Sequence, residues 1–283
     1  MSGTLDDDSP QARMWNGLAG QAWVDTQDLL DGLFQPMEDL LAQAVAARAP
    51  RSVLDVGCGA GATTLAAARL LGAQGHCTGI DISEPLIAAA RARALRDGTP
   101  ATFLRADAQR HAFAADGFDM VVSRFGVMFF DDPVQAFANL RHAAAAGADL
   151  RCLAWRSPED NPFMTAAERA AAPFLPDMPA RRPDAPGQFA FANARRVRGI
   201  LQDSGWNEID IRPIDIACTF PAKDLVRYVT RLGPLGQMLH TLDAQTRAQV
   251  TDTVRAAFDA YVHAEEVRLI AACWVIKARK GQA

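Results

Sequence analysis

The sequence predicts an α/β fold in which a doubly wound, mostly parallel sheet of seven strands carries helices on both faces. Three observations support this prediction. Short apolar runs typical of buried strands alternate with helical patterns, at about the 30-residue spacing of βαβ units. A glycine cluster follows the first run, where such folds turn from strand to helix. Acidic residues lie at the carboxyl ends of the first three runs, where open parallel sheets bind their ligands.

The strands and helices follow one another regularly along the chain. Strands are expected at residues 52–56, 76–82, 101–106, 118–123, 149–155, 209–218 and 268–276. One helix is expected to follow the glycine cluster and end at residue 71, and the others to cover 84–96, 133–146, 194–203, 225–239 and 244–263. Right-handed crossovers place such helices on both faces of the sheet.

The chain divides into four segments. Residues 1–48 form a tail and helices that cover a ligand site; Gly32 and Pro36 interrupt the helical spacing, which predicts two or three helices. Residues 49–156 form the sheet-based core. Residues 157–191 contain seven prolines, a density that fits no regular element, and are expected to form a lid. Residues 192–283 complete the sheet and carry a cap of helices within 221–263, and the helices, lid and cap are expected to share one face.

Charge and cysteine content narrow the class of protein. The 29 lysines and arginines face 33 aspartates and glutamates, a net charge of −4, which argues against nucleic-acid binding. No stretch approaches the ~18 apolar residues of a membrane-spanning helix. Five scattered cysteines without a Cys-x-x-Cys pair predict reduced thiols, and the acidic start MSGTLDDDSP is unlike a signal peptide. A cytoplasmic globular protein without a membrane partner is expected.

The strongest functional signal is the run Asp55-Val56-Gly57-Cys58-Gly59-Ala60-Gly61, between the first strand and its helix. Glycines at such a turn let backbone N–H groups approach a ligand. They also fit the fingerprint of dinucleotide sites, with an alanine in its third position. The carboxylate of Asp55 distinguishes a dinucleotide site from a site for a cationic ligand, because it repels a diphosphate and attracts an ammonium group. S-adenosylmethionine carries such a group.

Two further acids lie where that ligand needs them. Asp81 ends the second strand and can accept hydrogen bonds from both ribose hydroxyls, as an acid at this place does in dinucleotide folds. Ile82 beside it can pack on an adenine ring. Asp107 follows the third strand, where an oxygen can accept the adenine amino group. Trp23 either shields the ligand or anchors the N-terminal helices.

In their order, these motifs resemble those of the class I S-adenosylmethionine-dependent methyltransferases. V-L-D-V-G-C-G-A-G is similar to their first motif, G-I-D-I-S to their second and R-A-D-A to their third. The segment F-D-M-V-V-S-R-F-G-V-M-F-F-D-D-P resembles the small-molecule subgroup that includes ubiquinone- and menaquinone-type methyltransferases. The resemblance implies a Rossmann-like fold and S-adenosylmethionine as cofactor, with S-adenosylhomocysteine as product.

The resemblance also implies a role for each motif. The glycine loop would face the methionyl part, Asp81 the ribose, Asp107 with Ala108 the adenine, and Ser123 with Arg124 the sulfonium. The full set expected at the cofactor site is Asp55, Gly57, Cys58, Gly59, Gly61, Asp81, Ile82, Asp107, Ala108, Ser123, Arg124 and Trp23.

No catalytic group stands out from the sequence. His111, His240 and His263 are candidate bases, Arg124 is a fourth candidate, and no His or Cys spacing predicts a metal site. The acceptor is expected to be a small, largely apolar metabolite, methylated at oxygen, carbon or nitrogen by a monomer or homodimer. Two alternatives stay open: a nucleotide-dependent oxidoreductase that uses the same loop, and a non-catalytic S-adenosylmethionine-binding protein.

Overall fold

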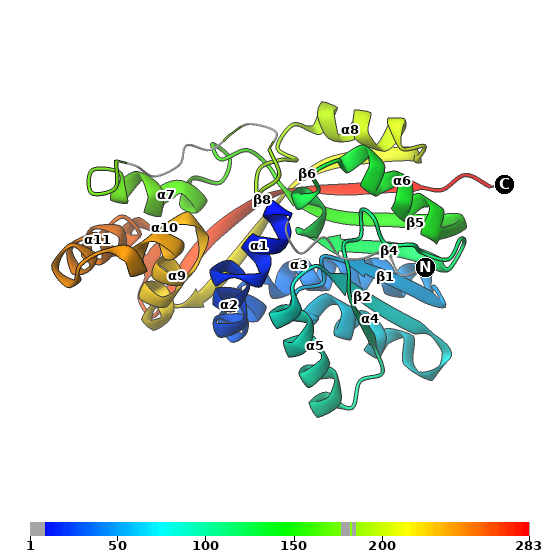
Figure 1. Ribbon diagram of the computed structural model, residues 1–283, viewed down its shortest axis with the longest axis horizontal. Helices are drawn as coiled ribbons and strands as arrows, with labels where there is room; N and C mark the ends of the chain where they lie inside the picture. The colour runs from blue at the N-terminus through cyan, green and yellow to red at the C-terminus, as the bar shows by residue number, and fades with distance from the viewer. Residues whose placement is uncertain (1–8, 177–181, 183–184, 283) are drawn as a thin grey trace.

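The computed structural model describes residues 9–176, 182 and 185–282, and a central sheet organises them (Figure 1). The strand order is β3-β2-β1-β4-β5-β8-β6. The parallel strands are β1 (Ser52–Val56), β2 (His76–Asp81), β3 (Thr102–Arg105), β4 (Phe118–Arg124) and β5 (Ala144–Trp155). β8 (Glu266–Arg279) runs antiparallel to β5, and both β6 (Asn207–Pro221) and the short β7 (Val262–His263) run antiparallel to β8. The predicted fold class is confirmed.

Helices cover both faces of this sheet (Figure 1). One face carries α3 (Gln27–Arg48), α4 (Ala62–Leu71) and α5 (Glu84–Asp97), and the other carries α6 (Pro133–Ala143) and α8 (Ala194–Asp203). On the first face, Val45 of α3 and Ala67 of α4 pack with Val53 of β1 and Met120 of β4 in a fully buried cluster. Burial of this apolar surface holds the helices on the sheet.

Parallel pairing aligns the carboxyl ends of the first strands. Asp55 of β1 lies opposite Gly79 of β2, and Asp81 of β2 lies opposite Arg105 of β3. On the other side of β1, Val122 of β4 lies opposite Asp55. The loops that follow these four strands therefore meet at one edge of the sheet.

The N-terminal segment contains three helices, but the expected interruption at Gly32 and Pro36 is wrong. α1 (Pro10–Asn16), α2 (Leu18–Asp25) and α3 are separated at Gly17 and Thr26, and α3 continues through Pro36. In a helix, a proline ring clashes with the carbonyl of the residue four positions earlier, which for Pro36 is Gly32. Burial of the continuous apolar face of α3 outweighs the cost of this clash. That face consists of Leu29, Leu30, Leu33, Phe34, Met37, Leu41 and Val45.

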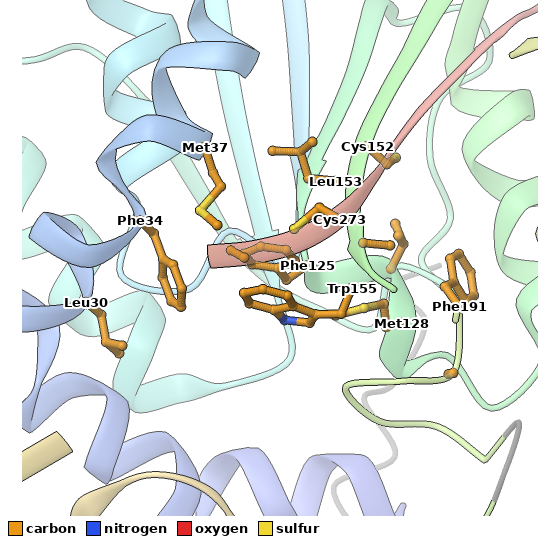
Figure 2. Packing of buried hydrophobic residues seen from close by; sticks show 14 of the residues in the cluster. Leu30, Phe34, Met37, Phe125, Met128, Cys152, Leu153, Trp155, Phe191 and Cys273 are labelled. Carbon is orange, nitrogen blue, oxygen red and sulfur yellow. The ribbon is translucent and has the colours of Figure 1, made fainter. Parts of the chain in front are cut away.

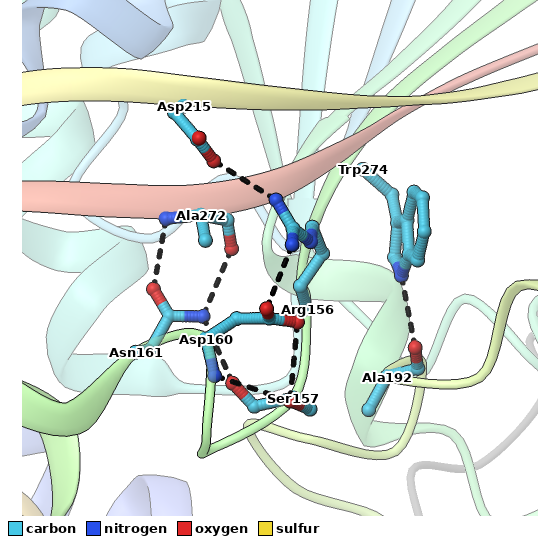
Figure 3. A network of polar contacts seen from close by, with 8 residues as sticks. All are labelled: Arg156, Ser157, Asp160, Asn161, Ala192, Asp215, Ala272 and Trp274. Carbon is cyan, nitrogen blue, oxygen red and sulfur yellow. Dashed lines mark hydrogen bonds and ion pairs between the residues drawn. The ribbon is translucent and has the colours of Figure 1, made fainter.

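The proline-rich segment 157–191 contains a helix, which the sequence reading missed. α7 (Pro162–Ala171) begins with Pro162 in its first turn, where the missing N–H group is not needed. The fully buried Asn161 side chain precedes it and exchanges two 2.9 Å hydrogen bonds with the backbone of Ala272 in β8 (Figure 3). Beside it, Arg156 bridges Asp160 and Asp215. Residues 177–181 and 183–184 of this expected lid, and residues 1–8 of the expected tail, lie outside the described residues.

Other helices and strands begin or end at different residues from those expected, because the sequence analysis did not recognise the turns between them. Residues 144–146, expected to be helical, begin β5, and Ala144 pairs with Phe118. The stretch 225–239 divides into α9 (Leu225–Arg231) and α10 (Gly233–Met238) at Leu232, whose backbone is extended, and Pro234 lies in the first turn of α10. α11 (Ala244–Ala256) ends before residue 263, and residues 262–263 form β7. Among the described residues, none of the helices is long and apolar enough to cross a membrane.

The Asn161 clamp gives a test of this architecture. Asn161→Ala leaves the buried N–H of Ala272 without its partner, whereas the Ala272 carbonyl keeps the Arg156 N–H, so we expect the unfolding free energy to fall by about 1–3 kcal/mol. Asn207→Ala, at an exposed asparagine, should change it by less than about 0.5 kcal/mol. Urea unfolding followed by circular dichroism compares the two variants. Equal stabilities would contradict the role of this clamp.

Candidate active site

A cavity of about 360 Å³ opens at the carboxyl ends of the parallel strands. Its lining comes from α1, α2 and α3, from the loops after β1, β2, β3 and β4, and from α7, residues 186–188, α9 and α10. Helices and loops far apart in the chain therefore enclose one space above the sheet edge. Its size and mostly apolar lining are typical of small-molecule sites.

Close backbone packing fixes the glycine loop at one end of this cavity. The N–H groups of Gly57 and Cys58 both donate to the carbonyl of Ile80, at 2.8 and 3.1 Å. Gly57 has a φ of +66°, and a Cβ atom there would lie 2.4 Å from the Cα atom of Gly126 in the loop after β4. This position therefore requires glycine, and the loop lies directly against its neighbours.

Asp81 connects the glycine loop to the turn after β2. Its carboxylate accepts hydrogen bonds from the N–H of Gly59 at 2.8 Å and from the N–H of Ser83 at 2.9 Å. Burial raises the pKa of Asp81, while these hydrogen bonds act in the opposite direction. Asp81 and Asp107 both border the cavity, and an oxygen of Asp107 accepts a hydrogen bond from the N–H of Gln109. The two carboxylates are thus held in place by backbone donors.

A smaller recess of about 40 Å³ adjoins the glycine loop and contains Asp55. Asp55 is 1% exposed, and its Oδ2 atom accepts a 2.6 Å hydrogen bond from the hydroxyl of Thr64. Its Oδ1 atom is buried and has no hydrogen-bond partner among the described residues. An unpaired buried carboxylate oxygen is costly, so this atom is suited to a ligand that brings a hydrogen-bond donor.

Arg124, at the end of β4, borders both the cavity and the recess. Its side chain is 13% exposed, yet its nearest ion-pair contact is to Glu38 Oε2 at 3.9 Å. The guanidinium also lies 5.7 Å from the centre of the Phe34 ring and donates a 3.5 Å hydrogen bond to the Phe34 carbonyl. Burial lowers the pKa of Arg124, and the neighbouring Glu38 acts in the opposite direction. A cation held this loosely can pair closely with an anionic ligand group.

The structure brings together most of the expected cofactor residues. The cavity is bordered by Trp23, Gly57, Gly59, Asp81, Ile82, Asp107, Ala108 and Arg124, and the recess by Asp55 and Cys58. Ser123 and Gly61 border neither space. The Ser123 hydroxyl donates to the Val56 carbonyl at 2.7 Å and accepts from the Gly126 N–H, so Ser123 supports the loops from below.

The histidines expected as candidate bases lie elsewhere. His111 packs against the ring of Phe113, and His240 and His263 are exposed on the cap. None of the three borders the cavity or the recess. Of the four catalytic candidates, only Arg124 does. Among the described residues, no group of three or more His, Cys, Asp or Glu side chains could hold a metal ion.

Several lining residues were missed by the sequence analysis. Asp31 and Phe34, three residues apart on α3, border the recess, and helical spacing could have placed them on one face. Trp155, the last residue of β5, borders the cavity with its ring stacked on Phe125 (Figure 2). Tyr228 comes from the cap, where the sequence carries no recognisable motif.

Comparison with known proteins agrees with this geometry. Residues 53–147 match the family model described as a methyltransferase domain. Residues 53–147 therefore form a methyltransferase domain. This match confirms the methyltransferase domain that the sequence motifs led us to expect.

Curated relatives match part of the chain. An uncharacterised protein of Mycobacterium tuberculosis is 29% identical over 185 residues, which are 65% of this chain and 64% of that protein. Aklanonic acid methyltransferase DauC of a Streptomyces species is 38% identical over 107 residues, 38% of this chain and 49% of that enzyme. The match thus spans less than two thirds of the length of these relatives.

A solved structure shows the same fold over a longer stretch. Phosphoethanolamine N-methyltransferase 2 of Haemonchus contortus, in complex with phosphomonomethylethanolamine and S-adenosylhomocysteine, aligns with a TM-score of 0.57 at 15% identity. The alignment covers 97% of this chain and 61% of that one. The likeness concerns the fold alone.

The burial of Asp55 predicts a pH-dependent stability. Burial raises its pKa to about 6 from 3.8, so between these values the folded chain holds a proton that the unfolded chain has released. Stability contributed at this site therefore falls as the pH rises through that window. We expect Asp55→Asn to gain in unfolding free energy relative to the wild type between about pH 4 and about pH 6.5, as measured by urea unfolding. A difference that does not change with pH would contradict the buried carboxylate.

Proposed function

We propose that this chain transfers the methyl group of S-adenosylmethionine to a small, largely apolar metabolite, at an oxygen, carbon or nitrogen atom. The observation that carries the proposal is the division of one cavity into two ends. The glycine loop, Asp81 and Asp107 supply polar groups at one end, whereas aromatic and methionine side chains line much of the remainder. The similarity to DauC, an aklanonic acid methyltransferase, also supports a small-molecule acceptor.

The donors and acceptors around the glycine loop suit each part of the cofactor. The ribose hydroxyls would donate to Asp81, and the adenine would lie between Ile82 and Ala108 with its amino group donating to Asp107. The Oδ1 atom of Asp55, which has no partner among the described residues, suits the α-ammonium group. Arg124 suits the α-carboxylate, because its guanidinium borders the same recess without a close ion pair.

When bound, S-adenosylmethionine would supply an electrophilic methyl group on its sulfonium. The chain's contribution is to bind, orient and exclude water. Phe125, Met128 and Trp155 border the cavity beyond the glycine loop and present apolar surface to the acceptor. Holding the reacting atoms about 3–3.5 Å apart in such a site can lower the barrier by ~7–11 kcal/mol. No side chain needs to act as a nucleophile.

The segments outside the core would close this site. We propose that residues 1–48 cover the cofactor, and that the lid 157–191 and the cap 221–263 form the acceptor pocket. In support, the Ser83 hydroxyl donates to the Trp15 carbonyl at 2.6 Å, and the Asn16 side chain accepts from the Glu84 N–H at 2.8 Å. These bonds dock the α1–α2 corner on the turn that follows Asp81. Phe163 of the lid and Tyr228 of the cap both border the cavity.

Calorimetry with S-adenosylhomocysteine tests the proposal. We expect the wild type to bind it, and Asp81→Ala to weaken binding by about 1–3 kcal/mol, because the ribose hydroxyls lose their acceptor. Asp97→Ala, in a surface ion pair with Arg69, should leave the affinity unchanged. Wild-type protein that binds NAD but not S-adenosylhomocysteine would refute the proposal in favour of an oxidoreductase. Binding without methylated product across a broad acceptor panel would favour a non-catalytic protein.

A second experiment separates the amino-acid end of the cofactor from its nucleoside end. We expect Arg124→Gln to weaken S-adenosylhomocysteine binding about tenfold, since a charge-assisted hydrogen bond is lost. Binding of 5′-deoxy-5′-methylthioadenosine, which lacks the amino and carboxylate groups, should stay as in the wild type. Equal losses for both ligands would mean that Arg124 acts on the structure of the site and not on the carboxylate.

A further inference from the structure

One side of helix α3 forms a wall of the small recess beside the glycine loop. The residues that border the recess from this helix are Gln27, Leu30, Asp31 and Phe34. Their spacing of three and four residues places them on one side of the helix. The Phe34 ring holds this side towards the sheet, because it packs against Phe125 with ring centres 5.5 Å apart (Figure 2). Helix α3, which precedes the methyltransferase domain, therefore brings two polar side chains to the recess, those of Gln27 and Asp31.

An ion pair with α5 holds Asp31 in this wall. The Asp31 Oδ2 atom lies 2.9 Å from a guanidinium nitrogen of Arg93, whose side chain is 16% exposed. The other terminal nitrogen of this guanidinium donates a 3.2 Å hydrogen bond to the carbonyl of Ala60 in the glycine loop. Arg93 thus connects α3 to the glycine loop. The Oδ1 atom of Asp31 accepts no hydrogen bond from any residue that the structure describes, so it can accept one from a ligand in the recess.

Gln27 and Asp55 bring two further acceptors to the same space. The half-buried Gln27 side chain lies one turn before Asp31 and makes no hydrogen bond within the described part of the chain. Asp55 borders the recess from β1, and its buried Oδ1 atom has no partner among the described residues. The recess holds about 40 Å³, which is room for about three water-sized groups. A group bound there is therefore within reach of both α3 and β1.

The number and charge of these acceptors match a primary ammonium group. Such a group carries one positive charge and three N–H donors, so a single carboxylate oxygen cannot satisfy it. Asp31 and Asp55 are the two acids of the described lining of the recess, and Gln27 adds a neutral amide oxygen. An ammonium group in the recess would thus find one acceptor for each of its donors. Hydrogen bonds from a charged donor to carboxylates are the strongest of their kind.

We propose that α3 completes the binding site of the cofactor's α-ammonium group, with Asp31 and Gln27 accepting hydrogen bonds beside Asp55. This inference rests on the proposed function and assigns further residues to one end of the cofactor. Arg124 borders the same recess and suits the α-carboxylate, so each charge of the amino acid meets a group of opposite sign. Selection of the amino-acid end then depends on a helix outside residues 53–147, the methyltransferase domain.

The test compares two ligands that differ only in the amino group. They are S-adenosylhomocysteine and its deamino analogue, 4-(5′-deoxyadenosin-5′-ylthio)butanoate, which keeps the nucleoside and the carboxylate. Each is titrated into the whole chain by calorimetry, and we expect the wild type to bind S-adenosylhomocysteine at least about tenfold more tightly. Asp31→Asn should weaken S-adenosylhomocysteine binding about tenfold, and Gln27→Leu about fivefold, because each loses an acceptor. Neither variant should bind the deamino analogue more weakly than the wild type does.

A matched variant on the same helix controls for charge. Asp39→Asn, at an exposed acid that accepts a 2.9 Å hydrogen bond from Gln35, should keep the wild-type affinity for both ligands. Equal losses for both ligands in Asp31→Asn and Gln27→Leu would overturn the inference, because these residues would then act on the structure of the site. Unchanged binding of S-adenosylhomocysteine in either variant would also overturn it. Wild-type protein that binds both ligands equally would overturn the inference alone, whereas wild-type protein that binds neither would overturn the proposed function as well.

Discussion

The site depends on the close approach of two backbone segments, at Gly57 after β1 and at Gly126 after β4. No side chain fits between them, so the two loops lie directly on each other. This contact turns the glycine loop towards β2, where the Ile80 carbonyl and the Asp81 carboxylate receive its N–H groups. The polar end of the cavity is therefore a property of the backbone, and the side chains around it add selectivity.

Charged groups of both signs surround the cavity and the recess. The carboxylates of Asp81 and Asp107 come from strand ends and border the cavity, Asp55 borders the recess, and Arg124 borders both. The buried groups among these have incomplete partners, which is costly in an empty protein. Such a cost is offset when a ligand of complementary charge binds. The same incompleteness distinguishes this end of the cavity from a structural ion-pair network, in which each charge has a close partner.

Sequence patterns predicted the core well because local and tertiary signals agree there. β1 was predicted at its observed bounds, since an apolar run followed by glycines has few alternatives. The missed features are those in which tertiary contacts override local signals. α3 continues through Pro36 because its apolar face is buried, and α7 forms because Asn161 and Pro162 begin it. No local pattern predicts the continuation of α3, whereas Pro162 is a local helix-start signal that the proline density around it obscured.

The candidate site was predicted in part for the same reason. Residues carried by motifs, such as Asp81 and Asp107, lie at the cavity, because their strands fix where they end. Ser123 is adjacent to Arg124 in sequence, but alternation along a strand turns it to the opposite side, where it supports the loops. Tyr228 belongs to the cap, whose helix α9 is held on the core by the buried side chains of Leu225 and Val229, far from the motifs in the sequence.

The pairing of β6 with β8 has a consequence for how new specificities arise. These strands pair from Asn207 with Arg279 to Pro221 with Glu266, so the chain leaves the sheet and returns to it at one fixed point. Residues 222–261 lie outside the sheet, and β7 at Val262–His263 brings the chain back to it by pairing with the start of β8. Recombination or grafting can therefore exchange this segment as a module, because its two attachment points stay adjacent whatever it contains. A change of length or sequence in this segment therefore leaves the pairing of β5, β8 and β6 in place.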